Sequence, residues 1–414
     1  MKNFAGLLSR ESAIMKIVLT FVLMILLSQF VSAQNTYTTY ANLPYADDGN
    51  VRHKLDLYVP DGATSSVPVI VWIHGGGWQS GDKQLGPNSH PLRYARNGYA
   101  VASINYRLSD EAIFPAQIHD VKAAIRWLRA NAAQYNLDAT RFGAWGQSAG
   151  GHLASLVGTS GDVKTLEGTV GGNTQFSSRV QAVVDWYGPT DFLRMDAQLT
   201  QNGCPNPNHN SPDSAESRLM GCAIQTCPDA VRRANPMTYV TSDDPPFFIE
   251  HGTADCTVAP GQSRIFQNLF QSVGHDSSLT FLQGAGHGGP QFTAESNLLL
   301  VDAFWNAKLR QASNPLINSI KVYRKNLEVN HFRPGALGSL YRISVSGANF
   351  QADTKVIING IEKGVSFVDG NEIVIYGFTG RIPSEGEMNI QLRNSNGRFS
   401  NVSRTEIREL NLSN

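Results

Sequence analysis

The sequence has no excess of charge of either sign, because 34 Lys and Arg residues balance 34 Asp and Glu residues. A protein that binds nucleic acid through its overall charge is normally basic, so we expect no nucleic-acid partner. Disorder over the whole chain is also excluded, since 41% of the residues are hydrophobic and only 16% are charged. With 414 residues, the chain exceeds one typical domain of about 100–200 residues, and we expect two domains.

A hydrophobic run long enough to span a membrane is missing from the N-terminal region. The apolar stretch from Ile17 to Leu27 is too short for a bilayer core, which needs about 20 residues. It follows Lys16 and precedes the small-residue site Val31-Ser32-Ala33, as in a secretory signal peptide. We expect residues 1–33 to be removed, with Met15 as an alternative start, and the protein to be secreted or periplasmic without stable membrane insertion. An uncleaved anchor helix is the alternative, whereas a lipoprotein is disfavoured because no Cys lies near the cleavage site.

Cysteine is scarce, with Cys204, Cys222, Cys227 and Cys256 as its four residues. In an exported protein an even number of cysteines predicts disulfides, and four cysteines allow three pairings. We favour a local Cys222–Cys227 bond and a longer Cys204–Cys256 bond. A zinc site is the alternative, but the Cys-x4-Cys spacing has no second pair and no flanking His. We therefore expect neither a metal nor another cofactor.

Strands and helices alternate between residues 34 and 310, which is typical of the α/β class with a mostly parallel sheet and helices on both faces. The continuously apolar Val69–Ile73 predicts a strand buried on both faces, whereas the alternating Lys54–Val59 predicts an edge strand. Further strands are expected at Tyr99–Asn105, Arg141–Trp145, Val180–Tyr187, Phe247–Glu250 and Leu279–Leu282, and helices at Pro115–Gln134, Gly150–Gly158, Gln262–Val273 and Thr293–Arg310.

This alternation stops at two places. Between about residues 191 and 235 the chain is rich in Asn, Pro, Gly and Ser and holds three of the four cysteines. We interpret this stretch as an insertion over the sheet edge that covers the active site.

After a linker at residues 311–315, short β-rich segments separated by turn residues occupy residues 316–410, as in an immunoglobulin-like β-sandwich. The segment contains no cysteine, so it lacks an antibody-type disulfide.

The strongest motif is Gly146-Gln147-Ser148-Ala149-Gly150. It lies between an expected strand and a helical stretch, which is the context of a Gly-x-Ser-x-Gly nucleophile elbow. The glycines let the backbone pass through a sharp turn that holds Ser148 at its tip. Because a hydroxyl is a weak nucleophile at neutral pH, Ser148 needs a base and a group that orients this base. A purely structural turn is the alternative.

A second glycine-rich loop, His74-Gly75-Gly76-Gly77-Trp78, follows the buried strand that ends at Ile73. Backbone amides in such a loop stabilise the oxyanion that forms when a serine attacks an ester carbonyl. We expect the amides of Gly76, Gly77 and Ala149 to be the donors, and His74 to orient the loop rather than act as a base. A flexible surface turn is the alternative.

The acid and the base of such a site should follow the nucleophile in the order Asp or Glu, then His. Asp255 and His287 satisfy this order, and each lies in a loop after one of the last two expected strands, where an open α/β sheet gathers its functional groups. We expect Asp255 to orient His287 and to stabilise its protonated form. Asp191 is the alternative acid, although it precedes the expected strand. His152 and His251 are expected to pack or to support neighbouring loops.

Together these motifs resemble the α/β-hydrolase superfamily over about residues 45–310. Within it, the loop at 74–78 followed by Ser80-Gly81-Asp82-Lys83 is similar to the carbohydrate-esterase branch near feruloyl and acetyl xylan esterases, which is related to hormone-sensitive-lipase-like esterases. The same pattern is matched by Asn105-Tyr106-Arg107-Leu108, Phe114-Pro115-Ala116-Gln117 and Gly284-Ala285-Gly286-His287-Gly288-Gly289. The resemblance implies a serine ester hydrolase that uses no metal.

The tail resembles the IPT/TIG family of immunoglobulin-like modules. The resemblance lies in the segments 315–320, 345–350 and 355–360, which read PLINSI, VSGANF and KVIING. Such a module offers no catalytic group here. A spacer or stabilising role and attachment to a glycan or a surface are the two expectations.

We therefore expect an exported enzyme that removes acetyl or feruloyl groups from plant polysaccharides through an acyl-enzyme on Ser148. Trp78, Trp186 and Tyr187 are candidates for lining the acyl or sugar side of the cleft, with core packing as the alternative for each. A broad short-chain carboxylesterase and a serine peptidase of the same fold are alternative enzymes, and the triple-glycine loop disfavours the peptidase. An adhesion or binding protein on a degenerate hydrolase fold would lack a nucleophile, acid or base, whereas this chain keeps all three.

Overall fold

The computed structural model describes most of the chain. The described residues are 36–161, 163–310, 316–327, 338–348, 350, 354–358, 360–363, 366–369, 372–378, 386–393 and 403–407. The chain divides between Leu309 and Arg310 into two compact units. The signal peptide predicted at residues 1–33 and the linker predicted at residues 311–315 lie outside the described residues.

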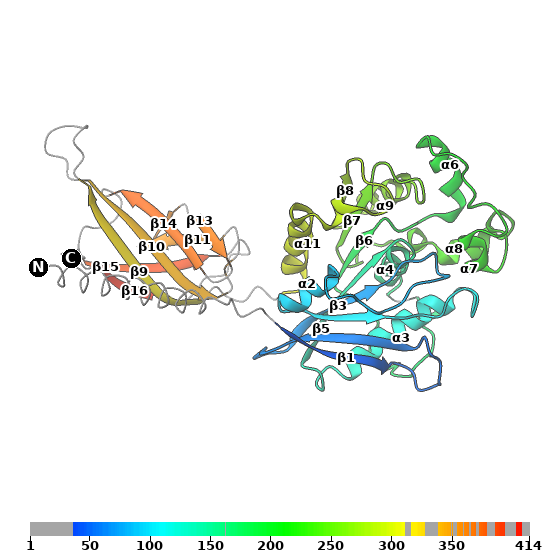
Figure 1. Ribbon diagram of the computed structural model, residues 1–414, viewed down its shortest axis with the longest axis horizontal. Helices are drawn as coiled ribbons and strands as arrows, with labels where there is room; N and C mark the ends of the chain where they lie inside the picture. Colours follow the sequence, from blue (N-terminus) through cyan, green and yellow to red (C-terminus); the bar gives the residue numbers. More distant parts are fainter. Residues whose placement is uncertain are drawn as a thin grey trace, which may run out of the picture. The chain divides into compact units, whose positions relative to one another are not determined.

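An eight-stranded sheet forms the centre of the first unit, in the order β1-β2-β4-β3-β5-β6-β7-β8 (Figure 1). Neighbours from β4 to β8 pair in parallel, whereas β2 pairs antiparallel with both β1 and β4. The strands are β1 (Tyr37–Pro44), β2 (Lys54–Pro60), β3 (Val67–Ile73), β4 (Ala100–Ile104), β5 (Leu137–Gln147), β6 (Ala182–Trp186), β7 (Phe247–Gly252) and β8 (Ser277–Leu282).

The prediction that Lys54–Val59 forms an edge strand is wrong. β1 pairs along β2 and takes the edge position, so β2 lies inside the sheet and its five central residues are buried. The residues of β1 are mostly exposed. An exposed, polar edge strand has no hydrophobic alternation by which the sequence could reveal it.

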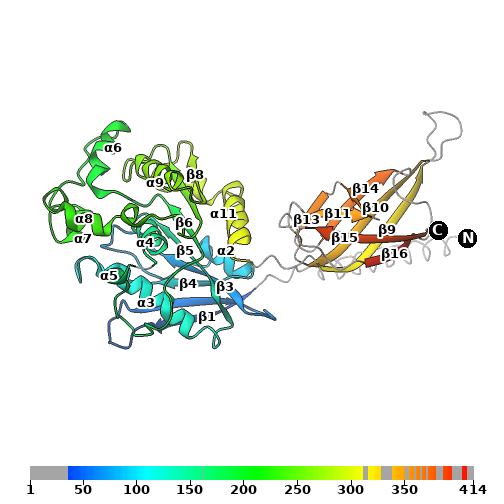
Figure 2. The same ribbon diagram turned by 180° about the vertical axis from the view of Figure 1, so that it is seen from behind.

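Helices cover both faces of this sheet (Figure 2). Val69, Val71 and Ile73 of β3 pack in one core with α3, α4 and α9, whereas Ile70 and Trp72 pack in a second core with α2 and α11. Successive side chains of a strand point to opposite faces, which explains why all seven residues of β3 are buried. The helices outside the insertion are α2 (Pro91–Arg96), α3 (Ala116–Ala130), α4 (Ala149–Thr159), α5 (Lys164–Glu167), α9 (Gly261–Ser272), α10 (Pro290–Thr293) and α11 (Glu295–Lys308).

The predicted insertion begins at the carboxyl end of β6 and consists of short helices. They are η1 (Phe192–Arg194), α6 (Met195–Gln201), α7 (Ala215–Met220), η2 (Ile224–Thr226) and α8 (Pro228–Ala234), followed by η3 (Pro236–Tyr239). In both views α6, α7 and α8 lie at one end of the unit, at the right in Figure 1 and at the left in Figure 2. The structure contains the two favoured disulfides: Cys222–Cys227 lies within the insertion, and Cys204–Cys256 joins the insertion to the loop after β7.

The second unit contains two four-stranded antiparallel sheets in the orders β13-β14-β10-β9 and β12-β11-β15-β16. One apolar core takes side chains from both sheets, among them Ile343 and Ile373 from the first and Val356 and Leu392 from the second. Two sheets that share a core in this way form a β-sandwich arrangement. The strands are β9 (Leu316–Leu327), β10 (Gly338–Ala348), β11 (Lys355–Ile358), β12 (Ile361–Lys363), β13 (Ser366–Asp369), β14 (Glu372–Phe378), β15 (Gly386–Arg393) and β16 (Ser403–Ile407).

Candidate active site

Ser148 occupies a sharp turn between β5, which ends at Gln147, and α4, which begins at Ala149. Its backbone angles are φ 55° and ψ −124°, a combination that non-glycine residues rarely adopt and that is found at functional sites. The turn leaves no room for a side chain at Gly146, where an added Cβ would lie 2.0 Å from the carbonyl oxygen of Gly150. The amide of Ser148 donates to the carbonyl of Trp186 at 2.9 Å, which fixes the turn to the neighbouring strand.

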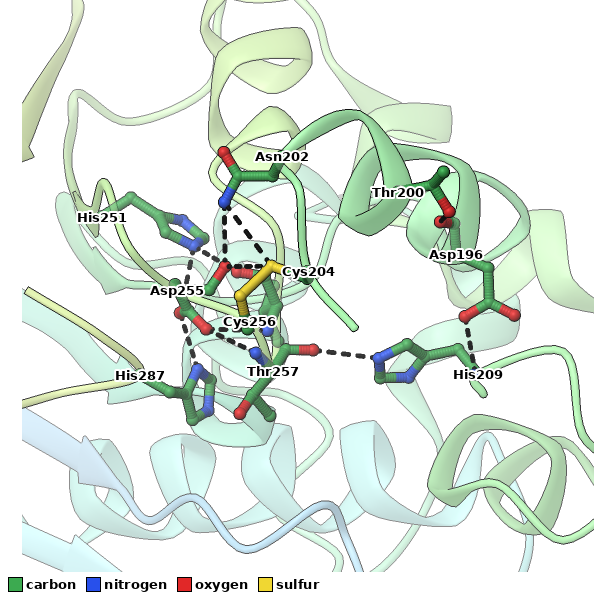
Figure 3. Close-up of a disulfide and its surroundings, with 11 residues drawn as sticks. Asp196, Thr200, Asn202, Cys204, His209, His251, Asp255, Cys256, Thr257 and His287 are labelled. Atoms are coloured by element: carbon green, nitrogen blue, oxygen red, sulfur yellow. Dashed lines mark hydrogen bonds and ion pairs between the residues drawn. A yellow bond between two sulfur atoms is a disulfide. The ribbon is translucent and has the colours of Figure 1, made fainter. Parts of the chain in front are cut away.

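The two side chains expected to act with Ser148 lie beside it. His287 Nε2 is 2.8 Å from Ser148 Oγ, and His287 Nδ1 is 2.8 Å from Asp255 Oδ2. Asp255 follows β7 and His287 follows β8, so two neighbouring parallel strands deliver them to the same edge of the sheet. Figure 3 shows the contact between His287 and Asp255. This arrangement lets the imidazole take the serine proton while the carboxylate orients the ring.

The carboxylate of Asp255 is fully buried and accepts several hydrogen bonds. Its Oδ1 accepts from the amides of Thr257 at 2.8 Å and Val258 at 3.0 Å. Burial alone would raise the pKa of Asp255, but hydrogen bonds and charge interactions with His251 and His287 reverse this effect and hold the pKa well below its usual range. Asp255 therefore stays ionised throughout the physiological pH range.

Asp191, the alternative acid, serves a different purpose. Its carboxylate accepts from the amide of Leu193 at 3.2 Å, at the start of η1, and from Asn235 Nδ2 at 3.3 Å. It also forms an ion pair with Arg194 at 3.1 Å. These contacts fix the beginning of the insertion, and the carboxylate that contacts His287 is that of Asp255.

The glycine-rich loop after β3 lies against the elbow. A Cβ added at Gly75 would be 3.3 Å from Ser148 Cβ, and one added at Gly76 would be 2.3 Å from the carbonyl oxygen of Ser80. Gly76 has φ +108° and Gly77 has φ +58°, both in the left-handed region that favours glycine. Gly75 thus lies against the elbow at Gln147 and Ser148, and the assignment of the amides of Gly76, Gly77 and Ala149 as oxyanion donors stays a prediction.

His74 is a structural part of this loop. Its Nδ1 is 2.7 Å from the carbonyl oxygen of Gly75, and its ring stacks on Tyr106 with 4.4 Å between centroids. Burial lowers the pKa of His74 to about 4, so the ring is neutral near pH 7. These contacts fit the expected role of orienting the loop.

Two of the three aromatic residues proposed for the cleft belong to the protein interior, which corrects that expectation. Trp78 and Trp186 are each only 1% exposed. Trp78 packs against His152 and Phe192, and the indole N–H of Trp186 donates to the buried carboxyl of Glu250. Burial of these large aromatic rings stabilises the fold more than a position at the surface would.

Tyr187, the third candidate, is 6% exposed but flanks the site. Its ring centroid is 4.7 Å from that of His287, and its hydroxyl donates to Gln147 Oε1 at 3.1 Å. Tyr187 thus packs beside the imidazole and links it to the residue before Ser148. His152 is fully buried, with Nε2 2.7 Å from the carbonyl oxygen of Ala234, and packs as expected.

Several residues near the site were not predicted. Ala215, at the start of α7, approaches Gly77, since a Cβ added there would be 3.4 Å from Ala215 Cβ. Asn202 and His209 of the insertion contact the loop that carries Asp255. The sequence offers one signal for these contacts: Cys256, which follows Asp255 directly, has its favoured partner in the insertion.

Metal clusters and membrane-spanning helices are absent from the part of the chain that the structure describes. Within that part, no group of three or more His, Cys, Asp or Glu side chains is arranged to hold a metal ion. No described helix combines the length and the apolar character needed to cross a bilayer.

Comparisons with known proteins identify the family of the chain. The model of the BD-FAE family matches residues 55–270, which is more than half of the 414-residue chain. The chain belongs to the BD-FAE family. The matched region contains the glycine-rich loop, Ser148 and Asp255, and ends before His287.

Relatives of this BD-FAE chain include esterases. The chain is similar to the esterase LipC of Mycobacterium tuberculosis, with 31% identity over 230 residues, which cover 55% of this chain and 54% of LipC. The chain thus spans about half the length of the curated relatives that it matches. These similarities support the expectation of a carboxylic ester hydrolase.

Solved structures similar to this BD-FAE chain include carbohydrate esterases. A truncated carbohydrate esterase from gut microbiota is 34% identical, with a TM-score of 0.61, and the match covers 67% of this chain and 98% of that one. A bifunctional GH43-CE protein from Bacteroides eggerthii is 39% identical, with a TM-score of 0.60, and the match covers 66% of this chain and 35% of that one. Both similarities support an α/β-hydrolase fold for the first unit. The assignment of the second unit to the IPT/TIG family stays a prediction.

Proposed function

We propose that this protein is a serine carboxylic-ester hydrolase that removes acetyl or feruloyl groups from plant polysaccharides. The observation that carries the proposal is the continuous chain of hydrogen bonds from Ser148 Oγ through His287 to Asp255, with 2.8 Å at each step. The similarity to carbohydrate esterases supports the polysaccharide-linked substrate.

The reaction begins at Ser148. As Oγ bonds to the acyl carbon, its proton passes to His287 Nε2, and Asp255 stabilises the resulting imidazolium. The carbonyl oxygen becomes an oxyanion, which the amides of Gly76, Gly77 and Ala149 stabilise. When the tetrahedral intermediate collapses, the ester C–O bond breaks, the alcohol leaves with the proton from His287, and the acyl group remains on Ser148.

Water completes the cycle. His287 Nε2 takes a proton from a water molecule as the water oxygen attacks the acyl carbon of the acyl-enzyme. A second tetrahedral intermediate collapses, Ser148 Oγ regains the proton, and the carboxylic acid is released. No oxidant, metal or cofactor is needed to balance either half of the reaction.

The first test compares hydrolysis of p-nitrophenyl acetate by the wild-type protein and by Ser148→Ala. We expect the substitution to lower kcat by roughly four orders of magnitude or more, because the nucleophile and its base act as a unit. Equal, background-level hydrolysis by both proteins would contradict the proposed enzyme.

A second test addresses the substrate. The purified protein is incubated with acetylated xylan, methyl ferulate, pectin and a peptide panel, and released acetate, ferulate and peptide fragments are quantified. Release of acetate or ferulate from the polysaccharide-related substrates supports the proposal. Cleavage of small esters alone would favour a broad short-chain carboxylesterase, and cleavage of peptides would favour a serine peptidase of the same fold.

We also propose export, because Lys16, the apolar stretch and the site ending at Ala33 have the order of a signal peptide. The two disulfides support an oxidising destination. N-terminal sequencing of the mature protein should find Gln34 as the first residue. Retention of residues 1–33 would contradict cleavage and favour an uncleaved anchor.

A further inference from the structure

The loop that carries Asp255 is fastened to the insertion at three consecutive residues (Figure 3). The carbonyl oxygen of Asp255 accepts from Asn202 Nδ2 at 3.3 Å, and the next residue, Cys256, forms the disulfide with Cys204. Asn202 and Cys204 both follow α6, so one short segment of the insertion makes both connections.

The third connection is made by His209. Its Nε2 is 2.9 Å from the carbonyl oxygen of Thr257, and its Nδ1 is 2.9 Å from Glu216 Oε2. The amide of His209 donates to Asp196 Oδ1 at 2.7 Å, which holds this histidine to α6. A carbonyl oxygen only accepts hydrogen bonds, so Nε2 is the donor, and the contact with Thr257 adds a third tether to the disulfide and the Asn202 hydrogen bond.

The tethered backbone is the same backbone that orients the carboxylate. The amides of Thr257 and Val258 donate to Asp255 Oδ1. Ala254, Cys256 and Thr257 are themselves exposed, whereas the amide of Ala254 donates to the carbonyl of Ala285 at 2.9 Å and Val258 packs in the core. The contacts from the insertion add restraints at the three residues between these anchor points, Asp255, Cys256 and Thr257.

We propose that the segment 202–209 is a positioning device for Asp255, in which the Cys204–Cys256 disulfide is the main restraint and Asn202 and His209 are secondary ones. In this way the insertion increases kcat by holding Asp255 in place, in addition to any role in covering the substrate. This proposal rests on the proposed serine-esterase function and names positioning residues for its acid.

The second disulfide offers a matched control. Cys222–Cys227 lies in the same insertion, but its cysteines contact the main chain of residues 220, 223 and 224 rather than the loop after β7. Removing each pair by the same substitution therefore separates a general effect of losing a disulfide from an effect on Asp255.

The experiment compares Cys204→Ser/Cys256→Ser with Cys222→Ser/Cys227→Ser. For each, kcat and KM for p-nitrophenyl acetate are measured at a temperature where circular dichroism shows both proteins to be folded. We expect the first variant to lose about tenfold in kcat with little change in KM, because a misplacement of about 1 Å costs up to about 100-fold in rate. We expect the control variant to stay within about twofold of wild type.

Two additional variants separate positioning from simple destabilisation. Asn202→Ala removes from an exposed side chain the hydrogen bond to the Asp255 carbonyl and the longer contact with Cys204 Sγ at 3.8 Å, so we expect a smaller loss of kcat with an unchanged Tm. In an Asp255→Ala background, removal of the Cys204–Cys256 pair should change kcat little further, because groups that act as a unit are not additive.

The outcomes distinguish the two proposals. If wild type has no Ser148-dependent hydrolysis, the proposed function fails and this inference fails with it. If wild type is active and Cys204→Ser/Cys256→Ser keeps the wild-type kcat, only the positioning role is overturned. An equal loss in both disulfide variants, or the same loss with and without Asp255, would also overturn it.

Discussion

His251 Nε2 lies 3.3 Å from Asp255 Oδ2, the same carboxylate oxygen that contacts His287. His251 and Asp255 are both fully buried. The same Nε2 is 2.8 Å from the carbonyl oxygen of Val258, while Nδ1 is 2.7 Å from Ser263 Oγ. Because a carbonyl oxygen and an ionised carboxylate only accept hydrogen bonds, Nε2 of His251 carries a proton. Asp255 therefore has a second imidazole partner beside His287.

Replacing His251 tests this relationship. His251→Phe keeps a ring in the buried space but removes the N–H near Asp255. We expect kcat to fall by about tenfold, because a tenfold change corresponds to about 1.4 kcal/mol, close to the free energy of one hydrogen bond to a charged group. KM should change little, and His251→Gln should restore part of kcat by supplying a donor. Steady-state kinetics on p-nitrophenyl acetate provide the measurement. Folded variants with wild-type kcat would show that His251 has only a packing role.

Substitution of Gly76 should damage the oxyanion loop. An alanine Cβ there would collide with the main chain of Ser80 at 2.3 Å, and φ +108° is unfavourable for alanine. We expect Gly76→Ala to raise the activation barrier by about 3 kcal/mol, which is typical for loss of one oxyanion donor. Gly77→Ala, whose Cβ meets only Ala215 at 3.4 Å, should cost less. The reverse order of kcat values would argue against the assigned geometry.

Glu250 should make stability depend on pH. It is fully buried beside Trp186, and burial raises its pKa from 4.5 to about 8. The folded protein keeps this proton up to about pH 8, whereas the unfolded chain releases it above pH 4.5. The stability that this group contributes is therefore complete below pH 4.5 and is lost as pH rises to about 8.

Glu250→Gln removes this titration while keeping an oxygen that accepts from Trp186. Between pH 5 and 8, the slope of the free energy of unfolding against pH should be less negative in the variant, by up to about 1.4 kcal/mol per pH unit. Urea denaturation at several pH values measures this slope. Parallel curves for the two proteins would contradict the prediction.

The two disulfides should also differ in their effect on stability. Cys204–Cys256 spans 52 positions of sequence and Cys222–Cys227 spans 5. From the entropy of loop closure, removing them should cost about 4 and about 2 kcal/mol, respectively. Chemical denaturation of the two double-serine variants tests the difference. An equal or reversed loss would show that native-state contacts outweigh chain entropy.

The parts of the site that depend on local chain geometry could be predicted from the sequence. The Gly-x-Ser-x-Gly motif implies the sharp turn at Ser148, because only glycine fits where Gly146 meets Gly150. The order of strands then selects Asp255 and His287. The imidazole of His287 lies within hydrogen-bond distance of both Asp255 and Ser148. Motif and strand order thus point to three side chains that the structure brings into contact, and their catalytic roles stay a prediction.

Features that depend on distant packing could not be predicted in the same way. Trp78 is covered by His152 from α4 and Phe192 from the insertion, and no local pattern reveals either contact. The insertion lacks helical periodicity because its helices are short, and two of them, η1 and α7, begin at the side-chain caps Asp191 and Ser214. Contacts between side chains and main-chain carbonyl groups, such as that of Asn202 with Asp255, cannot be predicted from the composition of the sequence.

The covalent bond from Cys204 to Cys256 limits how this enzyme can be redesigned. A chimaera that takes residues 191–235 from another protein would leave Cys256 as a free thiol next to the carboxylate it helps to hold. Grafts that aim to change substrate range should therefore exchange residues 191–257 as a single module, or supply a new cysteine opposite position 256.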